Sequence, residues 1–219
     1  TPIHAESINQ NDLKEVANFI INHPNIASKK WVYEQYDTMV RTNNMSTNFP
    51  ADAGIINIKE TNTALALTTD CNSRYVNSDP RIGTMIAVAE AARNIVCSGA
   101  EPIAITNCLN FGNPERPEVF FQLEQSVKGM VEVCRALEVP VISGNVSLYN
   151  ETSGIPIYPT PVIGMLGLLE DAAKRRTMAF EDGYSIALLG GSDTGSLGAS
   201  EYLEVIHGQV AGKPAPIDL

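Results

Sequence analysis

The chain has 219 residues, of which 44% are hydrophobic and 18% charged, with a formal net charge of −10. This composition is typical of a globular protein with a sizeable core, and its acidic balance argues against a nucleic-acid or anionic-membrane partner. The four cysteines stand singly without a C-x-x-C pair, so we expect free thiols in a cytoplasmic protein rather than a zinc site. No stretch of about 18 apolar residues suggests a membrane span. The sequence begins with threonine, which indicates a processed chain or a piece of a longer one.

Hydrophobic periodicity predicts an alternation of helices and strands. In chain order we expect helices over 8–22 and 28–36, an extended polar stretch over 37–48, strands over 53–59 and 63–69, a helix over 83–98, a strand over 102–109, a helix over 117–138, and strands over 139–142 and 162–169. From residue 53 onward, this order predicts an α/β sandwich with helices packed on one side of a sheet.

A polar stretch follows the predicted strand over 139–142. We expect a sharp turn at Ser143-Gly144-Asn145, where exposed backbone N–H groups are suited to hold an anion. The next side chains, from Asn145 through Ser147 to Glu151, suit a polar ligand or a hydrated metal. A polar turn that only caps the strand is the alternative.

Two further polar groups interrupt apolar segments. Asp70 directly follows a predicted strand, a common position for a Mg²⁺ ligand, although an aspartate there can also simply start a turn. Glu90 and Asn94 are four residues apart on a predicted helix and therefore share one face. That face either points into a polar site or forms a surface stripe.

A boundary is expected near residues 170–183, where charged residues break the apolar pattern. Tyr184 to Leu189 then predict a buried strand that ends in the glycine run over 190–195. That run lacks both the P-loop and the dinucleotide-binding pattern, so we interpret it as a tight strand-to-helix turn. Only 36 residues follow Gly183, too few for a second α/β domain, and we expect the chain to stop inside that domain.

Five motifs in one order carry a family resemblance: Tyr33-Glu-Gln-Tyr-Asp37, Thr68-Thr-Asp-Cys-Asn72, Ala87-Val-Ala-Glu-Ala-Ala-Arg-Asn-Ile95, Leu109-Asn-Phe-Gly-Asn-Pro-Glu115 and Gly144-Asn-Val-Ser-Leu-Tyr-Asn-Glu151. Together they resemble the second half of the phosphoribosylformylglycinamidine synthase family, in its small synthetase-subunit form. The aminoimidazole ribonucleotide synthetase family belongs to the same superfamily. The resemblance covers nearly all of the chain from about Ser28 onward.

The resemblance implies a mostly antiparallel sheet with helices on one face, as in the N-terminal domain of aminoimidazole ribonucleotide synthetase. It divides the chain into a lead-in over 1–30, this N-terminal domain over 31–172, and the start of a C-terminal α/β domain over 173–219.

The implied activity is that of an ATP-dependent ligase of de novo purine biosynthesis. This ligase converts formylglycinamide ribonucleotide, ATP and glutamine-derived ammonia to formylglycinamidine ribonucleotide. The family's catalytic histidine and most of its Mg²⁺ carboxylates lie in a first half that is absent here, so we expect the chain to be inactive alone. The implied partners are that first half, a glutaminase subunit and a small bridging subunit.

Carried over by motif, the family's ATP contacts fall on Asn107 and Gly144, its Mg²⁺ contact on Asn145 and its substrate contact on Ser147. Position 107 is a departure, since relatives often have aspartate there. An asparagine keeps a hydrogen-bond acceptor but loses the charge, which leaves a metal or ribose role open.

In larger relatives a second, non-catalytic nucleotide and Mg²⁺ are held by residues that match Asp70, Glu90 and Asn94. In this chain the three residues either retain that auxiliary site or are a structural leftover of it.

Two other functions remain open. The chain could be a binding and assembly module whose exposed sheet face pairs with a second copy to give a homodimer. It could also be another superfamily member, such as aminoimidazole ribonucleotide synthetase, selenophosphate synthetase or thiamine-phosphate kinase. The Val-Ser-Leu-Tyr-Asn-Glu continuation after Asn145 weighs against those three families.

Overall fold

The computed structural model describes residues 13–36, 38–47, 49–189 and 196–219. Its helices are α1 (Leu13–Asn22), α2 (Lys30–Tyr33), α3 (Ser73–Ser78), α4 (Pro80–Cys97), α5 (Pro117–Ala136) and α6 (Glu201–His207), with short 3-10 turns η3 (Val40–Thr42) and η4 (Ala172–Lys174). Its strands are β1 (Gly54–Asn57), β2 (Ala64–Asp70), β3 (Glu101–Asn110), β4 (Val141–Ser147), β5 (Glu151–Thr152), β6 (Ile155–Pro156) and β7 (Thr160–Leu169).

Five of these strands form the main sheet in the order β1-β2-β7-β3-β4. The pairs β1/β2, β2/β7 and β7/β3 are antiparallel, whereas β3 and β4 are parallel. A parallel neighbour needs a crossover connection, and α5 provides it between β3 and β4. The expectation of a mostly antiparallel sheet is therefore confirmed.

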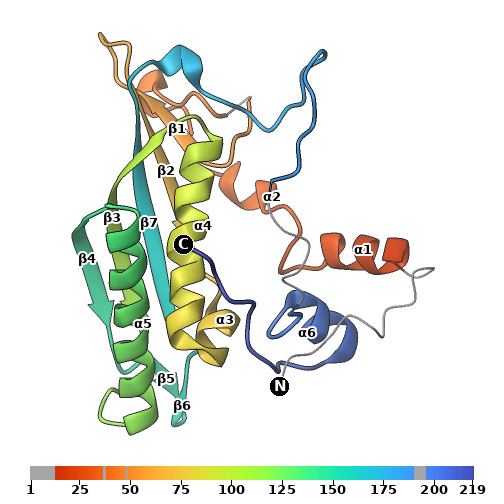
Figure 1. Ribbon diagram of the computed structural model, residues 1–219, viewed down its shortest axis with the longest axis vertical. Coiled ribbons are helices and arrows are strands. Elements are labelled where there is room, and N and C mark those ends of the chain that lie inside the picture. The colour runs from red at the N-terminus through yellow and green to blue at the C-terminus, as the bar shows by residue number, and fades with distance from the viewer. Residues whose placement is uncertain (1–12, 37, 48, 190–195) are drawn as a thin grey trace.

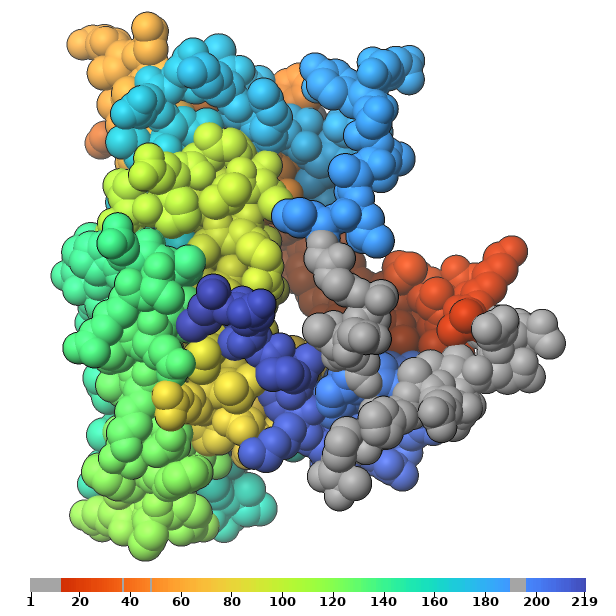
Figure 2. Space-filling view, viewed as in Figure 1, coloured from red at the N-terminus to blue at the C-terminus, as the bar shows by residue number. Residues whose placement is uncertain are grey.

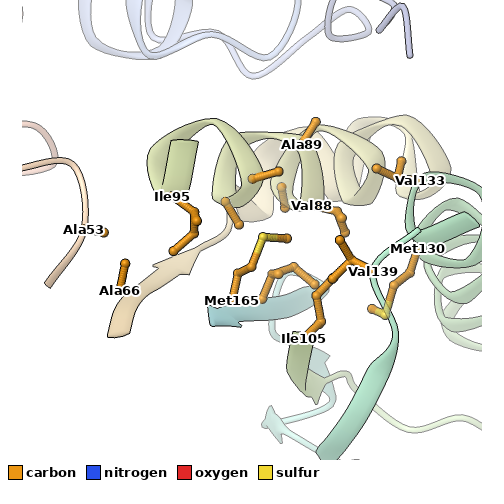
Figure 3. Close-up of a cluster of buried hydrophobic side chains, with 14 of the residues drawn as sticks. Ala53, Ala66, Val88, Ala89, Ile95, Ile105, Met130, Val133, Val139 and Met165 are labelled. Carbon is orange, nitrogen blue, oxygen red and sulfur yellow. The ribbon is translucent and has the colours of Figure 1, made fainter. Parts of the chain in front are cut away.

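Helices α4 and α5 cover one face of this sheet, as Figure 1 shows, and we call it the helix face. The core lies between the two layers. Burial alternates strictly along β7, where Ile163, Met165 and Leu169 are at most 2% exposed. Val88 of α4 and Ile105 of β3 lie in the same cluster, with their side chains directed toward one another in Figure 3. The predicted two-layer sandwich is confirmed.

Helix α4 begins three residues before its predicted start because Asp79 and Pro80 form a strong N-terminus. The Asp79 carboxylate accepts a hydrogen bond from the Ile82 N–H at 3.1 Å, and Pro80 occupies the first turn. Gly99 follows the helix with a φ of +88°, a conformation that favours glycine. The end of the helix is therefore as predicted.

We call the opposite surface of the sheet the open face. It carries the side chains that alternate along each strand with those of the helix face. Leu67 of β2 is 43% exposed there, and its partners in register are Leu166 of β7 and Gly54 of β1. Ile56 of β1 is 41% exposed on the same face. This face therefore presents apolar side chains to solvent.

The segments outside the sandwich depart most from the sequence-based predictions. The predicted helix over 28–36 is only the four-residue α2, and η3 interrupts the stretch that was expected to be extended. The predicted buried strand over 184–189 is wrong, since Ile186, Leu188 and Leu189 are 84–100% exposed and outside any strand. A strand requires a hydrogen-bonded neighbour, and this segment has none in the described chain. The glycine run over 190–195 lies outside the described residues.

The C-terminal segment returns to the sandwich, where Figure 2 shows it in dark blue against the yellow surface of α3 and α4. Ser78 donates a hydrogen bond to the Gly212 carbonyl, and the Lys213 ammonium lies 3.0 Å from the Asp79 carboxylate. All four cysteines are free thiols, as expected. Among the described residues, no helix is both long and apolar enough to cross a membrane.

Candidate functional site

The parallel pair β3 and β4 carries four of the residues that the sequence singles out. Asn107 of β3 lies beside Gly144 of β4, and Cys108 lies beside Asn145. Successive side chains on a strand point to opposite faces, so Asn107 and Gly144 belong to the helix face. Asn145 and Ser147 belong to the open face. The two groups of candidate residues therefore lie on opposite faces of the sheet. The candidate nucleotide residues are on the helix face, and the candidate metal and substrate residues are on the open face.

This arrangement corrects the sequence-based interpretation of β4. A turn was predicted at Ser143-Gly144-Asn145, but the strand continues through all three residues to Ser147. The physical reason is the parallel neighbour β3, whose backbone bonds hold β4 extended through the glycine. The predicted anion site, made of backbone N–H groups exposed at a turn, is therefore not formed by this segment.

The Asn107 side chain occupies the space beside Gly144. A side chain at position 144 would overlap the Asn107 Oδ1 atom and would lie 3.1 Å from the Asn107 Cγ. The other end of the amide is fixed as well, since its Nδ2 atom contacts the Met130 sulfur of α5 at 3.4 Å. Only glycine at position 144 leaves room for the amide of Asn107 in this position.

Beside Asn107 lies a cavity of about 740 Å³ between α5 and the β4 edge, which we call the β4–α5 cavity. Its walls are mostly apolar, with Met130 and Val127 from α5 and Leu109 from β3 among them. Arg135 and Glu138 lie at its polar border. An apolar cavity with a few convergent polar groups is the usual setting for a small organic ligand.

On the open face, Asn145 directs its Nδ2 atom toward the Cys108 sulfur at 3.7 Å, which turns its amide oxygen the other way. An amide oxygen is a hard ligand of the kind that Mg²⁺ accepts. The described chain contains no group of three or more His, Cys, Asp or Glu side chains arranged to hold a metal ion. A metal at Asn145 would therefore need further ligands from elsewhere.

A second polar cluster lies where β2 ends against α4. The Asn94 amide donates to the Asp70 Oδ1 atom at 2.8 Å, while the Asp70 Oδ2 atom is buried without a hydrogen-bond partner. Burial raises the pKa of Asp70 above its ordinary value. Burial, and then the charge of Asp70, raise the pKa of Glu90. Of the two alternatives left open by the sequence, a polar site or a surface stripe, the structure places Asn94 of this helix face against Asp70.

The surroundings of this second cluster are acidic. A cavity of about 820 Å³ beside Glu90 is lined by three glutamates, Glu90, Glu201 and Glu204, and by one arginine, Arg74. Arg74 pairs with both Glu201 and Glu204. Burial and the nearby carboxylates of Glu90 and Asp70 raise the pKa of the adjoining Cys71 thiol to about 12. These charges favour a cation over a polyphosphate.

The two clusters share one row of the sheet. Asp70, Ile163, Asn107 and Gly144 are consecutive partners across β2, β7, β3 and β4, all on the helix face. Strands lie about 4.8 Å apart, so Asp70 and Asn107 are separated by about 10 Å, with the buried Ile163 between them. The sequence did not predict this common row, because strand order cannot be read from periodicity.

Asn150 was predicted only as one of the polar side chains between Asn145 and Glu151 that suit a ligand, and its contact with Ser147 was not predicted. It lies in a quoted motif and bonds directly to Ser147. A sequence signal for this contact exists, because Asn150 follows Ser147 by three residues. At that spacing an asparagine side chain commonly forms hydrogen bonds within a loop.

Residues 50–169 match the family described as AIR synthase related protein, N-terminal domain. The chain is 52% identical over 208 residues to the phosphoribosylformylglycinamidine synthase subunit PurL of Caldanaerobacter subterraneus subsp. tengcongensis. That match covers 95% of this chain and 28% of the relative. The chain therefore spans little more than a quarter of this relative's length.

Solved structures give the same result. The structure of PurLQS from Thermotoga maritima has a TM-score of 0.63 and 37% identity over 70% of this chain and 25% of its own. T. maritima PurL complexed with ATP has a TM-score of 0.57 and 38% identity over 65% and 23%. The resemblance stated from the motifs is confirmed. Because the family match alone spans more than half of the sequence, the chain belongs to the AIR synthase related protein family, and residues 50–169 are its N-terminal domain.

Proposed function

We propose that this chain forms one wall of the ligase site of a phosphoribosylformylglycinamidine synthase. The observation that carries the proposal is the two-sided geometry of β4, with Asn107 and Gly144 on one face and Asn145 and Ser147 on the other. An ATP-dependent ligase must hold a nucleotide and an acceptor substrate on either side of the transferred phosphoryl group. The 52% identity to a PurL subunit and the similarity to PurL solved with ATP support this assignment.

On the helix face, we assign ATP to the β4–α5 cavity. Its apolar lining suits the adenine ring, and the Asn107 amide at its border offers both a donor and an acceptor. Gly144 keeps the edge strand narrow where the nucleotide would pass. Asparagine in place of the family's frequent aspartate removes a negative charge beside the phosphates.

On the open face, we assign Mg²⁺ to the Asn145 amide oxygen and the formylglycinamide ribonucleotide to Ser147. Mg²⁺ held by the Asn145 amide oxygen would supply positive charge to neutralise the phosphates of ATP. The amide oxygen of the substrate accepts the phosphoryl group from ATP, and ammonia then displaces it as phosphate to give the amidine. In this scheme the chain's own residues position the reactants.

We further propose that the remaining parts of the site come from other polypeptide segments. A first half of the same enzyme would supply the catalytic histidine and most Mg²⁺ carboxylates. A glutaminase subunit would deliver ammonia in a cytoplasmic complex that includes a small bridging subunit. We place the N-terminal domain at 31–172, after a lead-in over 1–30 and before the start of a C-terminal domain over 173–219.

The test measures ATP-dependent formation of the amidine product by the chain alone and by a full-length synthase that contains it. We expect no turnover by the chain alone. In the full-length enzyme, Asn107→Ala should raise the KM for ATP, and Ser147→Ala should raise the KM for the ribonucleotide. Turnover by the chain alone, or unchanged KM values in both variants, would contradict the proposal.

The cluster of Asp70, Glu90 and Asn94 supports a second role, that of an auxiliary Mg²⁺ or nucleotide site. The orphaned Asp70 Oδ2 atom and the raised pKa values of both carboxyls favour a bound cation. Calorimetric titration with ADP and ATP in Mg²⁺ distinguishes the roles. Binding lost in Glu90→Ala but retained in Asn145→Ala would assign the nucleotide to the auxiliary site, and the reverse result would make that cluster a structural leftover.

A further inference from the structure

Backbone hydrogen bonds join the end of β4 and the loop after it to the segment that follows β3. The Phe111 N–H donates to the Ser147 carbonyl at 3.0 Å, and the Asn150 N–H donates to the Phe111 carbonyl at 3.1 Å. The Tyr149 N–H donates to the Gly112 carbonyl at 2.9 Å, although Tyr149 itself has a φ of +58°. A left-handed backbone at a tyrosine costs about 1 kcal/mol and persists only where its surroundings hold it. The loop is therefore held in one conformation.

The side chain of Asn150 lies at the centre of this set. Its Nδ2 atom donates to the Phe111 carbonyl at 3.0 Å and to the Ser147 carbonyl at 2.9 Å. Both partners can only accept, so the amide nitrogen must face them. The amide oxygen is thereby turned toward the Ser147 hydroxyl, at 3.2 Å.

The amide oxygen of Asn150 cannot donate, so the proton of this third bond belongs to Ser147. With its proton directed at Asn150, the Ser147 oxygen presents its lone pairs to the open face. A hydroxyl in this state accepts a hydrogen bond from an N–H or O–H group. A hydroxyl that bound a substrate phosphate would instead have to donate its proton to the phosphate oxygen.

We infer that Asn150 is a positioning residue that accepts the hydrogen bond of the Ser147 hydroxyl, so that Ser147 recognises an N–H or O–H donor of the substrate rather than a phosphate oxygen. The inference rests on the proposed function, because it needs Ser147 to contact the formylglycinamide ribonucleotide. The formamide N–H groups and the ribose hydroxyls of that substrate are donors of the required class.

The test is a double-mutant cycle in the full-length synthase, with KM measured separately for the ribonucleotide and for ATP. Ser147→Ala and Asn150→Ala should each raise the KM for the ribonucleotide about fivefold, the effect of one neutral hydrogen bond, and leave the KM for ATP unchanged. The double variant should be no worse than Ser147→Ala, because Asn150 acts through the serine. Asn113→Ala is the matched control, since within the described part of the chain the Asn113 side chain accepts a hydrogen bond from the Glu115 N–H in its own turn, at 2.8 Å, and from no other residue.

Asn150→Asp separates positioning from structure. Aspartate keeps the oxygen that accepts from Ser147 but loses the donors to the two carbonyls, so stability should fall while the KM for the ribonucleotide stays near the wild-type value. Equal KM increases in Asn150→Asp and Asn150→Ala would overturn the inference, as would multiplied effects in the double variant. An unchanged KM in Ser147→Ala would overturn both the inference and the substrate contact in the proposed function.

Discussion

Gly144 affects the geometry of the candidate site because it has no side chain. Its position against the Asn107 amide leaves no space for a methyl group. Gly54 is a useful comparison because it also lies in an edge strand of the same sheet. A Cβ there would meet its nearest neighbour, the Leu67 carbonyl oxygen, at an ordinary 3.8 Å.

We therefore predict that Gly144→Ala weakens ATP binding by the full-length synthase on the order of tenfold, about 1.4 kcal/mol. The methyl group would displace the Asn107 amide from the border of the β4–α5 cavity. Gly54→Ala should leave the affinity unchanged. Calorimetric titration with ATP in Mg²⁺ measures both variants, and equal affinities for the two would show that the Asn107 position does not matter to the nucleotide.

The carboxyls of Asp70 and Glu90 should make folding stability depend on pH. Burial raises the pKa of both groups, and the charge of Asp70 adds to the effect on Glu90. A raised pKa means that the folded state binds protons more tightly than the unfolded state. The stability that these groups contribute is thus fully present below their unfolded-state pKa values and is lost as the pH rises through their folded-state values.

Glu90→Gln should consequently flatten the fall of thermal stability as the pH rises above the ordinary glutamate pKa of about 4.3, in buffers that contain a metal chelator. It should also raise the stability at neutral pH, because it removes one charge of the repelling pair. Glu101→Gln, at an exposed position, is the control. If thermal stability depended on pH in the same way in wild type and in Glu90→Gln, the raised pKa of Glu90 would be refuted. Added Mg²⁺ should stabilise wild type more than Glu90→Gln if the pair holds a cation.

How well the sequence predicted the site differs from one residue to another. The pairing of Glu90 with Asn94 followed from helical spacing, and the structure places Asn94 against Asp70. The sidedness of Asn107 and Asn145 was missed, because a predicted turn at Gly144 removed the alternation that separates the two faces. Glycine breaks strand patterns on average, but here the parallel neighbour β3 overrides that preference.

At the level of elements, the sandwich segments were predicted well and most flanking segments poorly. The exception is the helix predicted over 8–22, since α1 occupies Leu13–Asn22 of the described chain. Helices α4 and α5 and the strands β1, β2, β3 and β7 all lie within a few residues of their predicted bounds. The four strands and α5 each have one apolar face against the core, which is what periodicity detects. Helix α4 is buried along most of its length and was predicted instead from its density of alanine and other apolar residues. The segment over 184–189 has the same apolar character without a partner, so its sequence predicted a strand that the structure does not contain.

Close contact between α4 and α5 gives a prediction for Gly129. A Cβ at this position would overlap the Arg81 carbonyl oxygen and lie 3.1 Å from the Arg81 carbonyl carbon, which is backbone and cannot move aside. Alanine favours an isolated helix by about 1 kcal/mol over glycine, yet overpacking costs about 1–3 kcal/mol. We expect Gly129→Ala to lower the free energy of unfolding on balance.

Urea unfolding of Gly129→Ala and of Lys128→Ala checks this expectation. Lys128 precedes Gly129 on the exposed side of α5 and pairs with Glu124 at 2.9 Å. Its removal should cost no more than about 0.5 kcal/mol. A Gly129→Ala protein that is more stable than wild type would show that α5 can shift away from α4.

For the whole molecule, the two faces of the sheet are unequal. The helix face is covered by α4 and α5, and its central residues are fully buried. The open face carries leucines and an isoleucine that remain partly in solvent, together with the polar side chains of Asn145 and Ser147 on β4. Burying apolar surface is worth about 25 cal/mol per Å², so this face gains free energy from any matching apolar surface.

A second copy of the chain offers such a surface, because twofold symmetry brings the same patch to both sides of an interface. We predict that the chain dimerises at micromolar concentration through this face. Leu67→Lys should give a monomer, since Leu67 is 43% exposed at the middle of the apolar patch. Phe120→Lys should remain a dimer, because Phe120 is 56% exposed but lies on α5, on the opposite side of the sheet. Sedimentation velocity distinguishes these states. A monomeric wild type, or a Leu67→Lys variant that still dimerises, would mean that the open face does not drive self-association.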